Sequence, residues 1–196
     1  MGQKIFNFFV FVCVITGVII YSIHEDEVKA KQQLTNKQAI EMTKEIVKTQ
    51  GPLILKDLGV KDDGILSRIT INKGVRDDDY IGWYSGRSYT TWSDSNKIVY
   101  DEGTNTIDLY PYGYLTERDE NGDPVFLSKD QYPSKDEFKK EMIETLAHEL
   151  RHYWQDRTGE MIKHPYKDST PHDERWIEKD ANRYMEKYYQ SIQVNK

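Results

Sequence analysis

SKDEFKKEMIETLAHELRHYW, residues 134–154, is the stretch from which the fold of this chain is most readily predicted. Ser134 and Glu137 are spaced as a capping box, in which each side chain satisfies a backbone N–H group of the other residue. Apolar side chains then recur at three- and four-residue intervals and predict one buried helical stripe. These side chains are Phe138, Met142, Leu146, Leu150 and Tyr153. Gly159 is expected to end the helix.

The same helix carries the pattern His148-Glu149-Leu-Arg-His152, that is, HExxH. A spacing of four residues places the two imidazoles about 40° apart around the helix axis, so that both can reach one cation. Glu149 lies about 60° further round, between the histidines and the apolar stripe. We therefore expect Glu149 to lie beside a metal ion and to hold a water molecule without binding the ion itself.

A catalytic zinc site needs a third protein ligand and an open fourth position. Glu178 is the preferred candidate, because it begins the segment Glu178-Lys-Asp-Ala-Asn182 on a second predicted helix. We expect that helix to begin at Pro171, with Thr170 as its cap, and to pack against the first helix. Its buried face is predicted to consist of Ile177, Ala181, Tyr184 and Tyr188.

Other residues near Glu178 are also candidates for the metal site. Asp180, His164 and His172 are rival third ligands, since each is a residue type that binds zinc. Asn182 lies one turn after Glu178 and is expected to hydrogen-bond a ligand. The metzincin arrangement is excluded, because its third histidine would fall at position 158, which is Thr158.

Residues 134 to 190 resemble the gluzincins, the thermolysin-like metallopeptidases in which a glutamate on an E-x-x-x-D helix follows HExxH. The HExxH part matches in full, whereas Asn182 stands where the family usually has aspartate. The E-x-x-A-N form is also similar to small bacterial HExxH peptidases that cleave regulatory proteins. The resemblance implies zinc held by His148, His152 and Glu178, with Glu149 as general base. It also implies an α+β, zincin-like fold in which an edge strand, expected at Asn105–Tyr110, holds an extended peptide or protein substrate.

In this interpretation zinc lowers the pKa of a bound water toward ~7, and Glu149 takes its proton as the hydroxide attacks a carbonyl group. A further donor would stabilise the developing negative charge on the carbonyl oxygen. Tyr184, His172 and Arg175 are the candidate donors, although Tyr184 is more simply interpreted as a core residue.

The region before the HExxH helix is expected to be mainly β-structure. A helix is predicted at 36–48, ended by Gly51-Pro52, and a strand at 65–71. One or two strands follow within 80–91, and 96–100 is expected to pair with 105–110. Asn121-Gly122 predicts a hairpin between 112–117 and 125–127, in preference to a calcium loop. The aromatic cluster Trp83, Tyr84, Tyr89 and Trp92 is interpreted mainly as sheet packing, with a binding groove as the alternative. Asp77–Asp79 is expected to be a solvated loop.

The N-terminal region contains an uncharged apolar run, Ile5–Tyr21, which would span about 25 Å as a helix. Residues 1–23 are predicted to be a signal anchor, or else a signal peptide cleaved after Ala30. Residues 24–34 are expected to be a linker and 35–196 the zincin-like domain. The domain would then lie outside the cytoplasmic membrane of a bacterium, either anchored or secreted.

Composition excludes several classes of function. The formal net charge of −6 argues against nucleic acid as a partner, because phosphate binding needs a basic face. The single cysteine, Cys13, lies within the apolar run, so the remaining chain has no thiol for a disulfide, a nucleophile or a metal ligand. Two alternatives to a peptidase remain. One is a membrane-tethered binding module with structural metal or none, and the other is a zinc-dependent cell-wall amidase.

Overall fold

The computed structural model describes residues 34–76, 80–86, 88–91, 98–101, 103–128, 131–167 and 169–194. Within these ranges no helix combines the length and the apolar character needed to cross a bilayer. The predicted membrane segment Ile5–Tyr21 lies outside the described residues, as do the acidic run Asp77–Asp79 and Trp92.

Helix α3 (Lys135–Thr158) lies at the centre of the fold, because both of the other long helices and one strand of the sheet pack against it. Its N-terminus has the predicted capping box, with Ser134 accepting from the N–H of Glu137 and Glu137 accepting from that of Ser134. It ends at Gly159, which has the left-handed conformation with φ 78°. The predicted apolar stripe is buried over its whole length, so the prediction of this helix is confirmed.

Helix α2 (Asn36–Leu58) lies beside α3 and is longer than predicted. It does not end at Gly51-Pro52 but continues for two further turns, with Pro52 exposed inside the helix. The predicted end was wrong because Ile54, Leu55 and Leu58 bury apolar surface in the core, and this outweighs the backbone hydrogen bond that proline removes.

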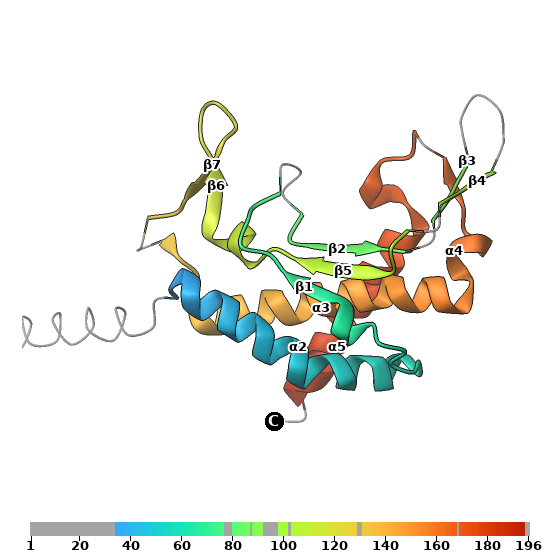
Figure 1. The fold of residues 1–196 in the computed structure, drawn as a ribbon, viewed down its shortest axis with the longest axis horizontal. Helices are drawn as coiled ribbons and strands as arrows, with labels where there is room; N and C mark the ends of the chain where they lie inside the picture. The colour runs from blue at the N-terminus through green and yellow to red at the C-terminus, as the bar shows by residue number, and fades with distance from the viewer. Residues whose placement is uncertain are drawn as a thin grey trace, which may run out of the picture.

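A three-stranded sheet lies over α3 on the side opposite the C-terminus, with α2 passing in front of α3 in this view (Figure 1). It consists of β1 (Ile69–Ile71), β5 (Thr106–Leu109) and β2 (Gly82–Ser85), in the order β1-β5-β2. β5 is parallel to β1 and antiparallel to β2. Because β5 has a partner on each side, the prediction that 105–110 forms an edge strand was wrong. The strand predicted at 65–71 is shorter, since its first part is the 3₁₀ turn η1 (Leu66–Arg68).

A second sheet has the order β4-β3-β8, and its strands are β3 (Ser88–Thr91), β4 (Ile98–Asp101) and β8 (Tyr166–Lys167). β4 pairs antiparallel with β3. The prediction that 96–100 pairs with 105–110 was therefore wrong. β8 adds to the other side of β3 in parallel. Through this pairing β8, which follows α3 in the chain, joins the sheet of β3 and β4.

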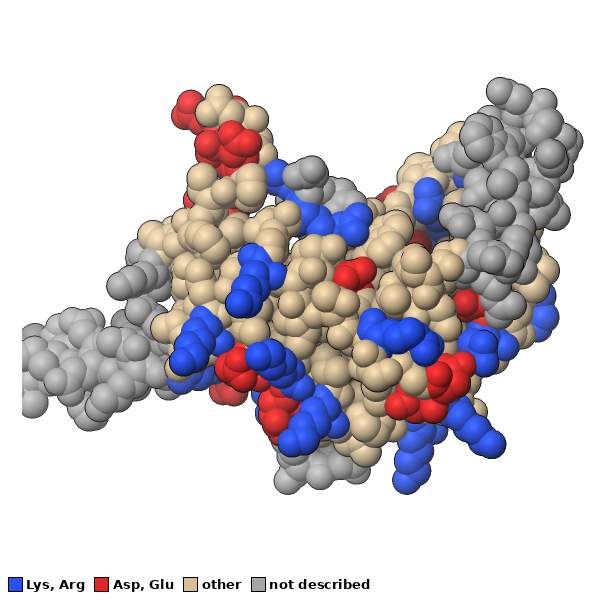
Figure 2. Space-filling model, in the orientation of Figure 1, with Lys and Arg blue, Asp and Glu red and all other residues tan. Residues whose placement is uncertain are grey.

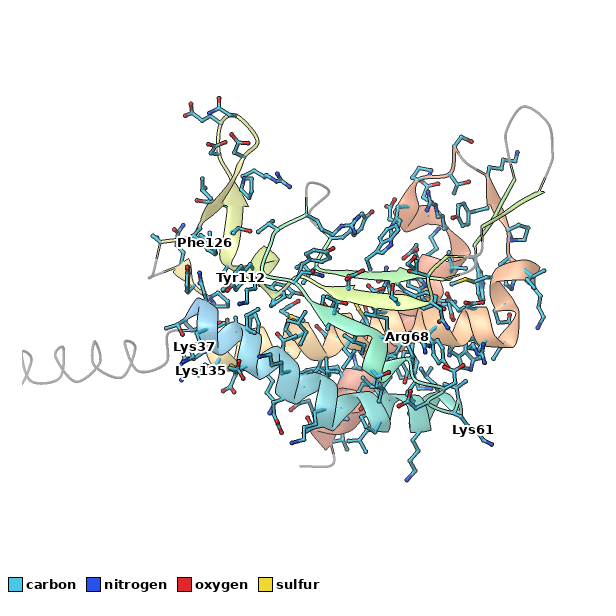
Figure 3. All side chains as sticks on the ribbon, in the orientation of Figure 1. Lys37, Lys61, Arg68, Tyr112, Phe126 and Lys135 are labelled. Atoms are coloured by element: carbon cyan, nitrogen blue, oxygen red, sulfur yellow. The ribbon has the colours of Figure 1, made fainter. Side chains whose placement is uncertain are left out.

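The predicted hairpin at Asn121-Gly122 is confirmed, with slightly different bounds. The turn η2 (Pro111–Leu115) leads into β6 (Thr116–Arg118), which pairs with β7 (Pro124–Phe126). At the base of the hairpin Phe126 lies against Tyr112, with ring centroids 5.8 Å apart (Figure 3). Acidic side chains gather at the hairpin tip, whereas both signs of charge intermingle over the rest of this face (Figure 2).

The chain ends with α4 (Glu160–Lys163), the 3₁₀ turn η4 (His172–Glu174) and helix α5 (Trp176–Val194). The helix predicted from Pro171 thus begins five residues later, because Arg175 has an extended backbone with φ −64° and ψ 140°. α5 packs closely against α3, with Ile177, Ala181 and Tyr188 buried and Tyr184 half-buried. One hydrophobic core joins α2, α3, α5 and the β1-β5-β2 sheet, so the structure is α+β with small mixed sheets.

Candidate metal centre

Helix α3 fixes the direction in which its polar residues point. Leu146, Ala147 and Leu150 are fully buried, and this sets the rotation of the helix about its axis. His148 then lies at the edge of the core, whereas Glu149 and His152 are buried, at 5% and 7% exposure. Buried polar side chains of this kind need partners.

Helix α5 brings Glu178 to the two histidines. Its Oε2 lies 3.3 Å from Nε2 of His148 and 3.1 Å from Nε2 of His152, and the two Nε2 atoms are 3.0 Å apart. Glu178 is itself buried, at 5% exposure, because Ile177 and Ala181 beside it face the core. The structure therefore brings together His148, His152 and Glu178, as the sequence predicted.

These separations fit a shared metal ion. Zinc binds histidine nitrogen and carboxylate oxygen at about 2.0–2.2 Å, so tetrahedral ligand atoms lie roughly 3.3–3.5 Å from one another. The three distances between the ligand atoms are close to that spacing. The cluster of His148, His152 and Glu178 could thus hold a metal ion, and two imidazoles with one carboxylate form a donor set typical of catalytic zinc.

The charges of the cluster also favour a cation. Burial alone would raise the pKa of Glu178, but the hydrogen bonds and charges of the histidines lower it well below its usual value. Burial alone would lower the pKa of His152, yet Glu178 and Glu149 raise it to about 9. The carboxylate of Glu178 is therefore held ionised beside positively charged His152. A metal ion would displace the proton between Nε2 of His152 and Glu178.

Glu149 lies next to the cluster but is not one of its three members. Burial raises the pKa of Glu149, although the charges of His148 and His152 and a hydrogen bond from the backbone of Tyr84 oppose that change. Strand β2 passes so close that a Cβ atom on Gly82 would lie 2.5 Å from Oε1 of Glu149. Only glycine allows this approach. Sequence reasoning did not identify Gly82, although a glycine inside a strand often marks such a contact.

A buried hydrogen-bond network contacts His152 at Nδ1, the ring nitrogen that does not face Glu178. Its Nδ1 lies 2.8 Å from Oε1 of Gln155, whose Nε2 donates to the backbone oxygen of Ile177 and to Asp180. Arg151 in turn makes two hydrogen bonds to the carboxylate of Asp180, at 2.8 and 3.3 Å. Because the amide oxygen of Gln155 can only accept, Nδ1 of His152 must carry the proton, and this leaves Nε2 free for a metal ion.

The network settles the position of two residues considered from sequence. Asp180 is hydrogen-bonded by Arg151 and Gln155, so it supports His152 through Gln155 instead of joining the cluster. The residue that hydrogen-bonds His152 is Gln155, which sequence reasoning missed, and not Asn182. Its position three residues after His152 on the same helix face was the signal that could have found it.

The remaining candidates differ in how close they lie to the cluster. Nε2 of His172 lies 3.2 Å from Oε1 of Glu178, the carboxylate oxygen that does not face the other two histidines. His164 stacks on Trp176 with ring centroids 3.7 Å apart and lies outside the cluster. Tyr184 donates to Asp57 of α2, and this directs its hydroxyl away from the histidines.

A cleft of about 400 Å³ opens onto the cluster. Strand β2 forms one wall, and Met161, Tyr166, Arg175 and Ile177 contribute to the others. Of the aromatic cluster noted in the sequence, Trp83 and Tyr84 line the cleft, and Tyr84 is also a core residue packed against Tyr153. The predicted metal ligands therefore lie in a cavity large enough for part of an extended chain.

Comparison with known proteins adds one finding. A family model described as "Protein of unknown function (DUF3920)" matches residues 125–196. The matched part begins within β7 and contains α3, α4, β8, η4 and α5, and therefore every member of the metal cluster as well as Gln155 and Asp180. No curated protein matches the chain. No solved structure matches it either.

Proposed function

We propose that this chain is a zinc-dependent peptidase with a zincin-like fold. His148, His152 and Glu178 would bind zinc, and Glu149 would act as the general base. The observation that carries the proposal is the convergence of three ligand atoms from α3 and α5, each 3.0–3.3 Å from the next. A buried fourth acid, Glu149, lies beside them without belonging to the set.

Zinc at this position would lower the pKa of a water molecule toward ~7 and polarise the carbonyl group of the substrate. Glu149 would take the proton of that water and give it to the leaving amine. Burial raises the pKa of Glu149, and this makes its carboxylate a stronger acceptor for the proton of the water. His172 and Arg175 line the cleft and are the remaining candidates for stabilising the carbonyl oxygen.

Strand β2 is the better candidate for holding the substrate, in place of the 105–110 strand. Among the described strands it pairs with β5 alone, and Gly82, Trp83, Tyr84 and Ser85 line the cleft. An extended peptide that paired with this edge would lie along the cleft and pass the metal cluster. In the proposed arrangement Ile5–Tyr21 is a signal anchor or a signal peptide, and the catalytic domain lies outside the membrane.

Metal analysis together with hydrolysis assays tests the proposal. The full chain should carry one zinc ion and cleave members of a peptide library, and Glu149→Gln should retain zinc but lose activity by a factor of 10² or more. Glu186→Gln, which changes an exposed acid on α5, should behave like the wild type. Activity on purified peptidoglycan without any on peptides would instead favour a cell-wall amidase. Full activity of Glu149→Gln would contradict both assignments.

A further inference from the structure

Arg175 is a cation on the wall of the cleft that opens onto the metal cluster. It follows η4, directly before α5, and among the described lining residues it is the sole lysine or arginine. His172, three residues earlier, contacts Glu178. Arg175 therefore lies in the same short segment as the proposed metal ligand Glu178. The cleft therefore has a fixed positive charge besides that of any bound metal.

The side chain of Arg175 is held in place by contacts that leave its outer nitrogens unused. Its guanidinium lies over the ring of Tyr166, 4.2 Å from the centroid, and its Nε donates to the backbone oxygen of Thr170 at 3.3 Å. The backbone of Tyr166 is held by its pairing with Thr90 between β8 and β3. The plane of the guanidinium is thus set before any ligand arrives, which lowers the entropy lost on binding.

The two outer nitrogens, Nη1 and Nη2, make no hydrogen bond or ion pair with another residue that the structure describes. This contrasts with Arg151, whose guanidinium is bound to Asp180. Asp173 also lines the cleft, but it is exposed and forms no ion pair with Arg175. A partly buried guanidinium with both outer N–H groups available matches the geometry of a carboxylate, which it can bind through two parallel hydrogen bonds.

We propose that Arg175 forms a subsite for a carboxylate of the substrate, so that the enzyme selects peptides carrying an acidic group near the cleaved bond. This inference rests on the proposed peptidase function and names the substrate class of the same cleft. The carboxylate can belong to an aspartate or glutamate side chain or to the C-terminus of a short peptide. Both present the same planar pair of oxygens to the guanidinium.

The test compares matched peptides that differ in one charge. One pair carries glutamate or glutamine at an internal position, with both peptides amidated at the C-terminus. A second pair differs in a C-terminal acid or amide. For the wild-type full chain we expect kcat/KM to be at least tenfold higher for the acid in one pair. The pair that shows the preference identifies the source of the carboxylate.

Three variants assign that preference to Arg175. Arg175→Gln should reduce it to less than threefold, and Arg175→Lys should restore part of it, because lysine keeps the charge but not the paired N–H groups. Arg175→Glu should invert it toward peptides with lysine in place of glutamate. Lys187→Gln removes an exposed positive charge from α5 outside the cleft and should leave the preference unchanged. An equal loss in this control would show a long-range charge effect and overturn the inference.

Binding measured by calorimetry separates this inference from the proposed function. The same peptide pairs are titrated into zinc-loaded Glu149→Gln protein and its Arg175→Gln derivative. Tenfold tighter binding of the acidic peptide that is lost in the derivative supports the subsite even if no hydrolysis is found. Hydrolysis of both members of each pair at equal rates, with equal affinities, would overturn the subsite and leave the peptidase proposal standing.

Discussion

Gly82 is the residue of strand β2 at which an added side chain would collide with the general base that we propose. A Cβ atom there would lie 2.5 Å from Oε1 of Glu149 and 2.7 Å from Cγ2 of Thr145. Gly82→Ala must therefore displace the strand or the glutamate, at a cost of about 1–3 kcal/mol in the free energy of unfolding. We expect activity to fall at least tenfold while zinc is retained, since none of the metal ligands is altered.

Urea unfolding, zinc analysis and peptide hydrolysis measure these three effects of Gly82→Ala. Gly74→Ala is the matched control, because a Cβ atom at Gly74 meets nothing within 4 Å. Equal activity of the two variants would show that the contact between β2 and Glu149 does not matter for catalysis.

Gln155 orients His152 through a single hydrogen bond, so its effect should appear in metal affinity. Gln155→Leu removes the acceptor for Nδ1 and the donor to Asp180 while keeping a side chain of similar size. We expect zinc affinity to fall about 10–100-fold, as is usual when a partner of a metal-binding histidine is lost. Competition with a chromophoric chelator measures the affinity, and Lys139→Ala, at an exposed position on α3, is the control. An unchanged affinity would remove Gln155 from the metal site.

Asp63 and Tyr153 form a hydrogen-bonded pair whose contribution to stability depends on pH. The hydrogen bond from Tyr153, 2.7 Å long, lowers the pKa of Asp63, and the charges of Arg157 and Arg68 act in the same direction. The resulting stabilisation is present above the unfolded pKa of about 3.9 and is lost as the pH falls through the lower, folded value. Tyr153→Phe should raise the pKa of Asp63, as measured by NMR titration of its carboxyl carbon.

The stability of the same variant provides a check on this assignment. The free energy of unfolding of Tyr153→Phe should be lower than that of the wild type by about 1 kcal/mol at pH 6, and this difference should shrink below pH 4. A difference that stays constant down to pH 3 would mean that the hydroxyl of Tyr153 acts independently of the charge on Asp63.

At the level of elements, helix α2 contains a local defect that the rest of the molecule tolerates. Pro52 is exposed within the helix and removes one backbone hydrogen bond. Pro52→Ala should therefore increase the free energy of unfolding by about 1–3 kcal/mol, since alanine is about 3 kcal/mol more favourable than proline in a helix interior. Urea unfolding measures the change. Destabilisation by Pro52→Ala would show that proline is required there for packing.

Elements whose signals are local were predicted well from the sequence. The capping box of Ser134 and Glu137 and the helix end at Gly159 depend on contacts between near neighbours, and both are present. The four-residue spacing of His148 and His152 likewise fixed their common side of α3. The start of α5 was misplaced because Thr170 and Pro171 resemble a helix cap but lead into the turn η4.

At the level of the whole molecule, strand pairing was the least predictable feature. Nothing in 105–110 indicates that its partners would be β1 and β2, because those contacts join residues far apart in the chain. The expected edge strand was wrong for this reason. In contrast, the convergence of Glu178 on the histidines was predicted correctly, since it follows from two amphipathic helices that bury their apolar faces against each other. The supporting role of Asp180 needed the three-dimensional structure, because its partners Arg151 and Gln155 lie on the other helix.

The central claim is that α3 and α5 together bind one zinc ion through His148, His152 and Glu178. Competition titration of zinc into the full chain and into Glu178→Gln and Asp180→Asn tests it most directly. We predict one tightly bound ion in the wild type, at least 100-fold weaker binding in Glu178→Gln, and a smaller loss in Asp180→Asn. Wild-type affinity in Glu178→Gln, or a larger loss in Asp180→Asn than in Glu178→Gln, would contradict the account.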